Sequence, residues 1–200
     1  MASPPEALNE LATRLRAEES VISPCVGDPN GQLPALGMLV AAGPRVSDAA
    51  SEYAILFESI REGYLLHYAR PRVVNAADDD LALLAGDYLY ARGLERLAAL
   101  GDLEAVRELS DLISLVAQLH AGDDDPAEAQ DGAPSLWLAS AVTVAAGPPP
   151  HHGEAKAALR EGSAEAPRML WDGAANTAAH AGLSERLGAA AESIGFRPPS

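Results

Sequence analysis

Apolar residues recur at spacings of three and four along most of the chain, which is the periodicity of amphipathic helices. The cleanest pattern lies between Val106 and Leu119, and a continuous stripe from Tyr53 to His67 marks another long helix. Turn and capping residues limit these segments, beginning with a capping box formed by Ser3 and Glu6. The sequence predicts helices over 1–22, 33–42, 47–68, 78–100, 102–120 and 136–146, with two or three weaker ones after residue 154.

Composition favours the same fold class. Hydrophobic residues make up 48% of the chain but aromatic residues only 4%, so Ala and Leu supply most of the apolar side chains. Both are strong helix formers, whereas the β-branched and aromatic residues typical of strands are sparse. A chain of 200 residues suits one domain. We therefore expect an all-α, single-domain antiparallel helical bundle over 1–200, with a core over 33–121, an acidic loop over 122–134 and weaker helices over 135–195.

One helix carries a charge inside its apolar pattern. Within 78–100, the spacing predicts a buried face formed by Leu81, Leu84, Tyr88 and Ala91. Asp87 interrupts this helix, and burying an unpaired carboxylate costs free energy. We therefore predict that Asp87 is held by a hydrogen-bonding or ion-pairing partner.

The formal net charge is −15, which disfavours binding to the phosphates of nucleic acid or to anionic lipid head groups. The N-terminus lacks the basic and apolar regions of a signal peptide, and no apolar run approaches the ~20 residues of a membrane helix. The single cysteine, Cys25, excludes an internal disulfide. These features predict a cytoplasmic protein with no nucleic-acid partner and no membrane insertion.

Three segments resemble the trans-isoprenyl diphosphate synthases, the polyprenyl synthetase family. Residues 80–91, DLALLAGDYLYA, are similar to the family's A-I-L-x-G-D-Y-L-x-A stretch. Residues 33–42, LPALGMLVAA, resemble its L-R-P-A-L-x-L-L-A-A helix, and 58–67 falls where the family has E-x-x-H-x-x-x-L-x-H. The three occur in the family's order, so the resemblance implies the isoprenoid synthase fold and an isoprenyl diphosphate as ligand.

The chain departs from the family where the chemistry would take place. Family members carry two D-D-x-x-D motifs that hold Mg²⁺ against the diphosphate, because the departing pyrophosphate needs divalent cations to neutralise its charge. Here His67 is followed by Tyr-Ala-Arg-Pro, and no second motif occurs after residue 135. The resemblance therefore implies a non-catalytic partner or regulatory subunit without a cofactor, present as a homodimer or as a heteromer with a catalytic prenyl synthase.

Two alternatives remain open from the sequence. The first is an active prenyltransferase that binds Mg²⁺ through unconventional acids, for which the candidates are Asp78, Asp79, Asp80, Asp123, Asp124 and Asp125. Consecutive aspartates point in different directions around a helix, and acidic residues also complement a helix N-terminus, so both triplets equally suit caps and turns. The second alternative is a helical adaptor unrelated to isoprenoids.

A few other residues are candidates for contacts with substrate. Arg70 and Arg72 correspond to the arginine pair that follows the family's first motif, and they are candidate contacts for a diphosphate, as is Asp87 if it lies near a cavity. His67 lies on an apolar stripe, and two roles are open for it: a histidine packed in the core, or a ligand or base. His151 and His152 follow three prolines and are predicted to lie in a solvated loop.

Overall fold

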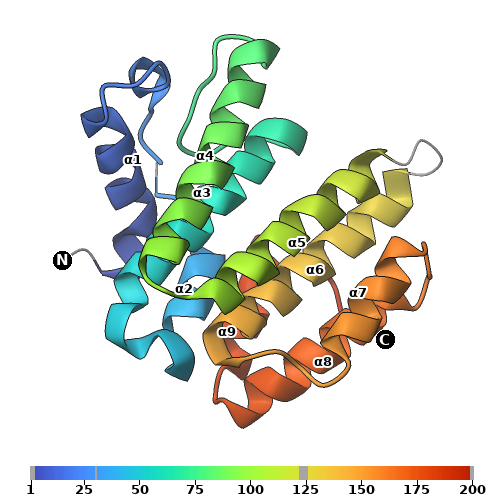
Figure 1. Ribbon diagram of the computed structural model, residues 1–200. Coiled ribbons are helices and arrows are strands. Elements are labelled where there is room, and N and C mark those ends of the chain that lie inside the picture. Colours follow the sequence, from blue (N-terminus) through green and yellow to red (C-terminus); the bar gives the residue numbers. More distant parts are fainter. Residues whose placement is uncertain (1–2, 30, 122–125, 199–200) are drawn as a thin grey trace.

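The structure is a computed structural model that describes residues 3–29, 31–121 and 126–198. These residues form nine α-helices and three short 3-10 helices, packed into a single body (Figure 1). The 3-10 helices span Pro4–Glu6, Ser23–Cys25 and Pro44–Ala49. The expected all-α class is confirmed.

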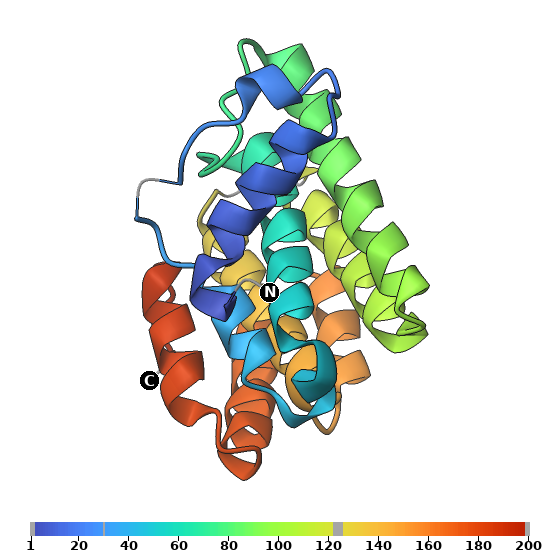
Figure 2. The ribbon, with the colours of Figure 1, turned by 90° about the vertical axis from the view of Figure 1, so that its left-hand side faces the viewer.

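Helix α3 (Ala50–Tyr68) lies at the centre of the N-terminal half. It packs against α1 (Ala7–Ala17), α2 (Ala35–Ala41) and α4 (Asp79–Ala99), so nearly every face of it is covered. Figure 2 shows α1 lying along α3, with α4 on the other side of that helix. Because α3 is enclosed, its polar residues are buried along with its apolar stripe, and they need partners inside the protein.

Helix α6 (Pro126–Ala146) is the second central helix. Its residues from Leu136 to Ala145 are apolar or small and buried on all sides, as expected for a helix without a polar face. It contacts α2, α5 (Leu103–Ala121) and α8 (Ala166–His180), while α7 (His152–Arg160) and α9 (Ser184–Ser193) cover α8. In Figure 1, α5 and α6 run side by side, with α7 and α8 packed below them.

Close approach between α3 and α4 depends on glycine. A Cβ atom on Gly86 would collide with the imidazole of His67 and lie 3.1 Å from the carbonyl oxygen of Gly63. A Cβ atom on Gly63 would in turn lie 2.9 Å from the ring of Tyr90. The glycine within the resembling segment 80–91 is therefore a packing residue that brings the two helices together.

Several expectations about the elements are wrong. The buried face of α4 consists of Ala85, Gly86, Leu89, Gly93 and Leu97, whereas Leu84 is exposed. The smaller side chains are buried because they let α4 approach α3. The loop predicted over 122–134 is helical from Pro126, since a proline suits the first turn of a helix as well as a loop. Pro167 likewise lies in the first turn of a helix, α8.

Candidate functional site

A buried group of charges, here called the α3 charge cluster, consists of Glu58, Arg61 and Glu62 from the C-terminal half of α3 and Arg72 from the segment that follows it. Both glutamates are fully buried. Nη1 of Arg72 lies 2.7 Å from Oε2 of Glu58, and its Nε lies 3.2 Å from Oε2 of Glu62. Burial disfavours the charged guanidinium, but the two carboxylates outweigh that cost and raise the pKa of Arg72.

Glu62 also fixes the backbone that follows α3. Its Oε1 accepts hydrogen bonds from the backbone N–H groups of Arg72 at 2.7 Å, Val73 at 2.6 Å and Val74 at 3.1 Å. Glu58 reaches in the other direction and accepts from the backbone N–H of Gly37 on α2 at 2.7 Å. The two glutamates therefore tie α2, α3 and the segment leading to α4 into one unit.

Arg61 is held by aromatic rings. Its guanidinium carbon lies 4.5 Å from the ring centroid of Tyr64 and 4.8 Å from that of Trp137 on α6. Within the described residues, its buried Nη1 atom has no hydrogen-bond partner. Burial lowers the pKa of Arg61 to about 10. Its charge therefore depends on the ring faces and on the nearby carboxylate of Glu58.

The arginines proposed from the sequence have different environments. Arg72 lies inside the protein and is ion-paired with both glutamates of the α3 charge cluster. Arg70 is exposed at the end of α3. The structure thus uses Arg72 to join segments of its own chain and leaves Arg70 facing solvent.

His67 and Asp87 are brought together, but not in a buried pair. Nε2 of His67 lies 3.3 Å from Oδ1 of Asp87, in a geometry that is not that of a hydrogen bond. The side chain of Asp87 is 76% exposed, so the prediction that it is buried is wrong. It lies on the outer side of α4, because Gly86 faces α3. The imidazole of His67 stacks on the ring of Tyr90, with centroids 5.3 Å apart.

The first aspartate triplet caps a helix. Oδ1 of Asp78 accepts a hydrogen bond from the backbone N–H of Leu81 at 2.8 Å, while Asp79 and Asp80 are exposed in the first turn of α4. The cap interpretation of Asp78 is confirmed. Asp123, Asp124 and Asp125 lie outside the described residues. Within the part of the chain that is described, no three His, Cys, Asp or Glu side chains are placed to hold a metal ion.

A second buried network lies between α5 and α7. Glu108 accepts from Ser140 at 2.6 Å and from Nζ of Lys156 at 3.0 Å, and Nε2 of His152 lies 3.0 Å from it. Lys156 also lies 2.7 Å from Asp111. The solvated-loop prediction is wrong for His152, which begins α7 and is buried, whereas His151 is exposed.

The charges of this network shift the acidity of Glu108. Burial alone would raise the pKa of Glu108, but the hydrogen bond from His152 and the charge of Lys156 outweigh burial and lower it to about 2. The network borders a pocket of about 500 Å³ whose lining includes Arg45, Arg107 and His152. Because each carboxylate has a cationic partner in the chain, this network mainly joins α7 to α5.

Comparisons with known proteins identify no relative. No family model matches the chain, and neither the search of curated proteins nor the search of solved structures found a match. Among the described residues, every helix is too short or too polar to cross a membrane.

Proposed function

We propose that this protein is a non-catalytic partner subunit in isoprenyl diphosphate synthesis, with the isoprenoid synthase fold. The proposal rests on the sequence resemblance together with one observation, the structure of the C-terminal end of α3. In the resembling family, metal-binding aspartates on a helix follow the histidine matched by His67. Here the helix ends at Tyr68, and the next positively charged side chains are Arg70 and Arg72.

The chemistry at this end of α3 supports a role other than metal-assisted ionisation. Mg²⁺ binds carboxylate oxygens, and a diphosphate leaving group needs the cation to neutralise its charge. The nearest buried carboxylates, Glu58 and Glu62, are already bonded to Arg72 and to backbone N–H groups. These carboxylates already form ion pairs and hydrogen bonds that stabilise the fold. This favours a subunit that binds or regulates a catalytic homologue.

The competing hypothesis is an active prenyltransferase that uses the aspartate triplets. Asp78 is engaged in capping α4, and Asp79 and Asp80 are exposed in the first turn of that helix. An aspartate triplet that caps a helix at the protein surface supports metal binding, and hence this hypothesis, less than it supports the partner role. It remains a distinct outcome of the experiment below.

The test uses the full chain carrying an affinity tag, expressed in its native host. Proteins that co-purify are identified, and the complex is assayed with Mg²⁺, an allylic diphosphate and isopentenyl diphosphate. We expect the isolated chain to be inactive, and a captured prenyl synthase to change its rate or product length when the chain is added back. Turnover by the isolated chain would show that it is an enzyme, and capture of partners without prenyl synthase activity would indicate a helical adaptor.

A further inference from the structure

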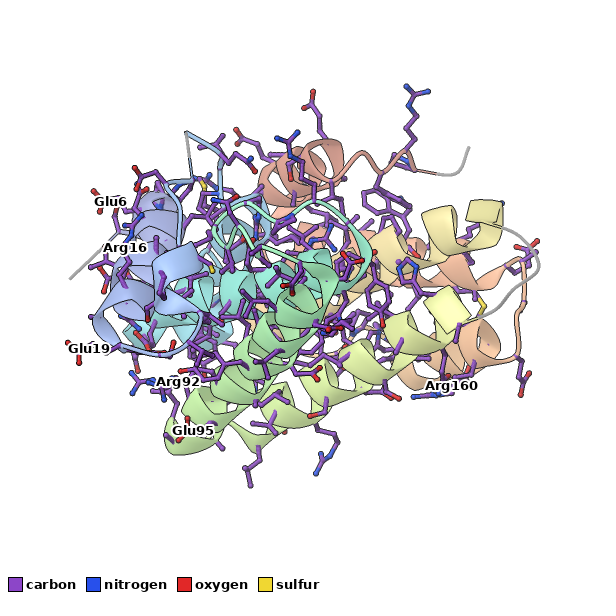
Figure 3. The ribbon with its side chains drawn as sticks, turned by 90° about the horizontal axis from the view of Figure 1, so that it is seen from above. Glu6, Arg16, Glu19, Arg92, Glu95 and Arg160 are labelled. Atoms are coloured by element: carbon purple, nitrogen blue, oxygen red, sulfur yellow. The ribbon has the colours of Figure 1, made fainter. Side chains whose placement is uncertain are left out.

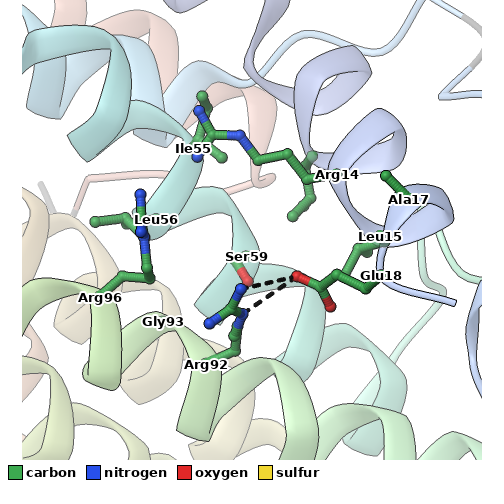
Figure 4. Close-up of a pocket in the computed structure, with 11 residues that line it drawn as sticks. Arg14, Leu15, Ala17, Glu18, Ile55, Leu56, Ser59, Arg92, Gly93 and Arg96 are labelled. Atoms are coloured by element: carbon green, nitrogen blue, oxygen red, sulfur yellow. Dashed lines mark hydrogen bonds and ion pairs between the residues drawn. The ribbon is translucent and has the colours of Figure 1, made fainter. Parts of the chain in front are cut away.

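A pocket of about 310 Å³ lies between α1, α3 and α4 (Figure 4). Its floor is apolar. Leu11 and Leu15 of α1 and Ile55 and Leu56 of α3 line it, and all four are buried in the protein. Ser59 adds one hydroxyl, and Gly93 lines the α4 side of the pocket.

Three arginines surround this apolar floor. Arg14 comes from α1, and Arg92 and Arg96 come from successive turns of α4. In Figure 4, the guanidinium group of Arg92 lies beside Ser59, and those of Arg14 and Arg96 lie on the side of Ile55 and Leu56. Glu18 is the one acidic residue among the lining residues. The lining therefore carries three positive charges and one negative charge.

The carboxylates that pair with these arginines lie deeper or to the outside. The side chains of Arg14, Arg92 and Arg96 are 36%, 39% and 48% exposed, whereas those of Glu52 and Glu18 are 20% and 21% exposed. The side chains of the three arginines are thus more exposed than those of Glu18 and Glu52, whereas Glu95, which also pairs with Arg92, is 67% exposed.

Arg96 has the most unused hydrogen-bonding capacity. Among the contacts of the described residues it makes one, from Nη2 to Oε1 of Glu52 at 2.9 Å, which leaves its Nε and Nη1 groups for another acceptor. Nη1 of Arg92 donates a hydrogen bond to Glu95 at 2.8 Å and so points toward the outer edge of α4. Figure 3 shows both side chains. A guanidinium with free N–H groups beside an apolar pocket suits the oxygens of a phosphate or carboxylate.

The overall charge of the protein makes this cluster unusual. The chain has 14 Lys and Arg residues against 29 Asp and Glu, and its net charge of −15 repels anions at long range. Three of the 14 cations nevertheless lie around one apolar opening. An anion would be attracted here by local contacts, and an apolar tail would gain by leaving water for the floor of the pocket.

We infer that this pocket binds a small amphipathic anion, with a phosphate or carboxylate head at the three arginines and a short unbranched or branched apolar tail on the leucine-lined floor. At roughly 30 Å³ for each water-sized group, the volume accommodates about ten non-hydrogen atoms. The inference does not depend on the proposed partner role, and its failure would leave that role untouched.

The test measures binding of hexyl phosphate to the full chain by isothermal titration calorimetry. We expect one saturable site, with inorganic phosphate and hexanol each binding at least tenfold more weakly, because each lacks one half of the ligand. Octanoate in a parallel titration distinguishes a carboxylate head from a phosphate head.

Two substitutions test the binding of the head group and of the tail separately. Arg96→Gln should weaken hexyl phosphate at least tenfold, the loss expected for a charge-assisted hydrogen bond. Ala17→Phe places a ring at the pocket mouth from an exposed position, so it should reduce binding without disturbing the core. The matched control is Arg168→Gln, which removes a similarly exposed arginine that pairs with Asp172 on α8 and should leave binding unchanged.

The inference is overturned if hexyl phosphate binds no more tightly than inorganic phosphate, since the apolar floor would then contribute nothing. Equal losses from Arg96→Gln and Arg168→Gln would also overturn it, because they would show non-specific attraction to any surface arginine. Circular dichroism of each variant checks that the helices are retained.

Discussion

Replacing Glu108 with glutamine should destabilise the protein strongly at neutral pH and much less in acid. The carboxylate accepts from Ser140 and Lys156 and contacts His152, and the side chain of Lys156 is only 4% exposed. Glutamine keeps the size of the side chain but removes its charge. The buried lysine would then retain Asp111 as its remaining carboxylate partner, at 2.7 Å.

The size of the expected loss of stability follows from the pKa of Glu108. Folding lowers the pKa of Glu108 from its ordinary value of 4.5 to about 2, which corresponds to about 3 kcal/mol of stability at pH 7. Because the folded pKa is the lower one, the unfolded chain binds the proton first. This stabilisation is complete above about pH 4.5 and is lost as the pH falls through about 2.

Urea unfolding followed by tryptophan fluorescence measures the effect, since Trp137 is fully buried. We expect Glu108→Gln to lose about 3 kcal/mol at pH 7, and the difference from the wild type to shrink steadily below pH 4.5. Glu104→Gln, one turn earlier on α5 and 75% exposed, is the matched control and should cost less than about 1 kcal/mol. A loss at Glu108 that is small, or that is unchanged in acid, would refute the charge network as the source of stability.

Two further substitutions test the packing around α3. Arg72→Met should cost about 3–5 kcal/mol in urea unfolding at pH 7, because it leaves the buried Glu58 and Glu62 without their shared cation; a loss below about 1 kcal/mol would contradict this. Gly86→Ala should cost about 1–3 kcal/mol in the same assay, since the added methyl group meets His67 and forces α4 away from α3. An unchanged midpoint there would show that the two helices separate freely.

The helices themselves were predictable because residues close to each helix end determine where the helix begins and ends. The capping box at Ser3 is present, with the backbone N–H and hydroxyl of that residue both donating to Glu6, and Asp102 accepts from the backbone N–H of Ala105 at the start of α5. Which face of a helix is buried was less predictable. On α4, Leu84 is exposed and Leu81 and Tyr88 are only half-buried, whereas Ala85, Gly86 and Gly93 are buried. Hydrophobicity favours the larger side chains, but close helix packing favours the smaller ones.

The charged sites were not predictable from spacing alone. Glu62 and Arg72 are ten residues apart and separated by the end of a helix and a proline, so no helical periodicity relates them. Glu108 and His152 come from different helices, with α6 between them in sequence. One signal was available: Glu58 and Glu62 lie among apolar residues of a helix that the pattern marked as long and buried. Fully buried glutamates require partners, and the first two cations beyond the helix end are Arg70 and Arg72, of which Arg72 forms the ion pairs.

Ion pairs within the chain hold the arginines of this pocket, and this bears on how the pocket would bind an anion. Arg14 lies in the last turn of α1 and Arg96 in the last turn of α4, where a positive charge interacts favourably with the helix dipole. Glu52 accepts from both arginines and holds them 2.9 Å from its oxygens. The guanidinium groups are therefore positioned in advance, and an anion that arrives loses little free energy to ordering side chains. If so, Glu52→Gln should weaken ligand binding despite removing a negative charge, because the arginines would lose their fixed positions. Tighter binding in that variant would instead show that charge, rather than positioning, governs the affinity of the pocket.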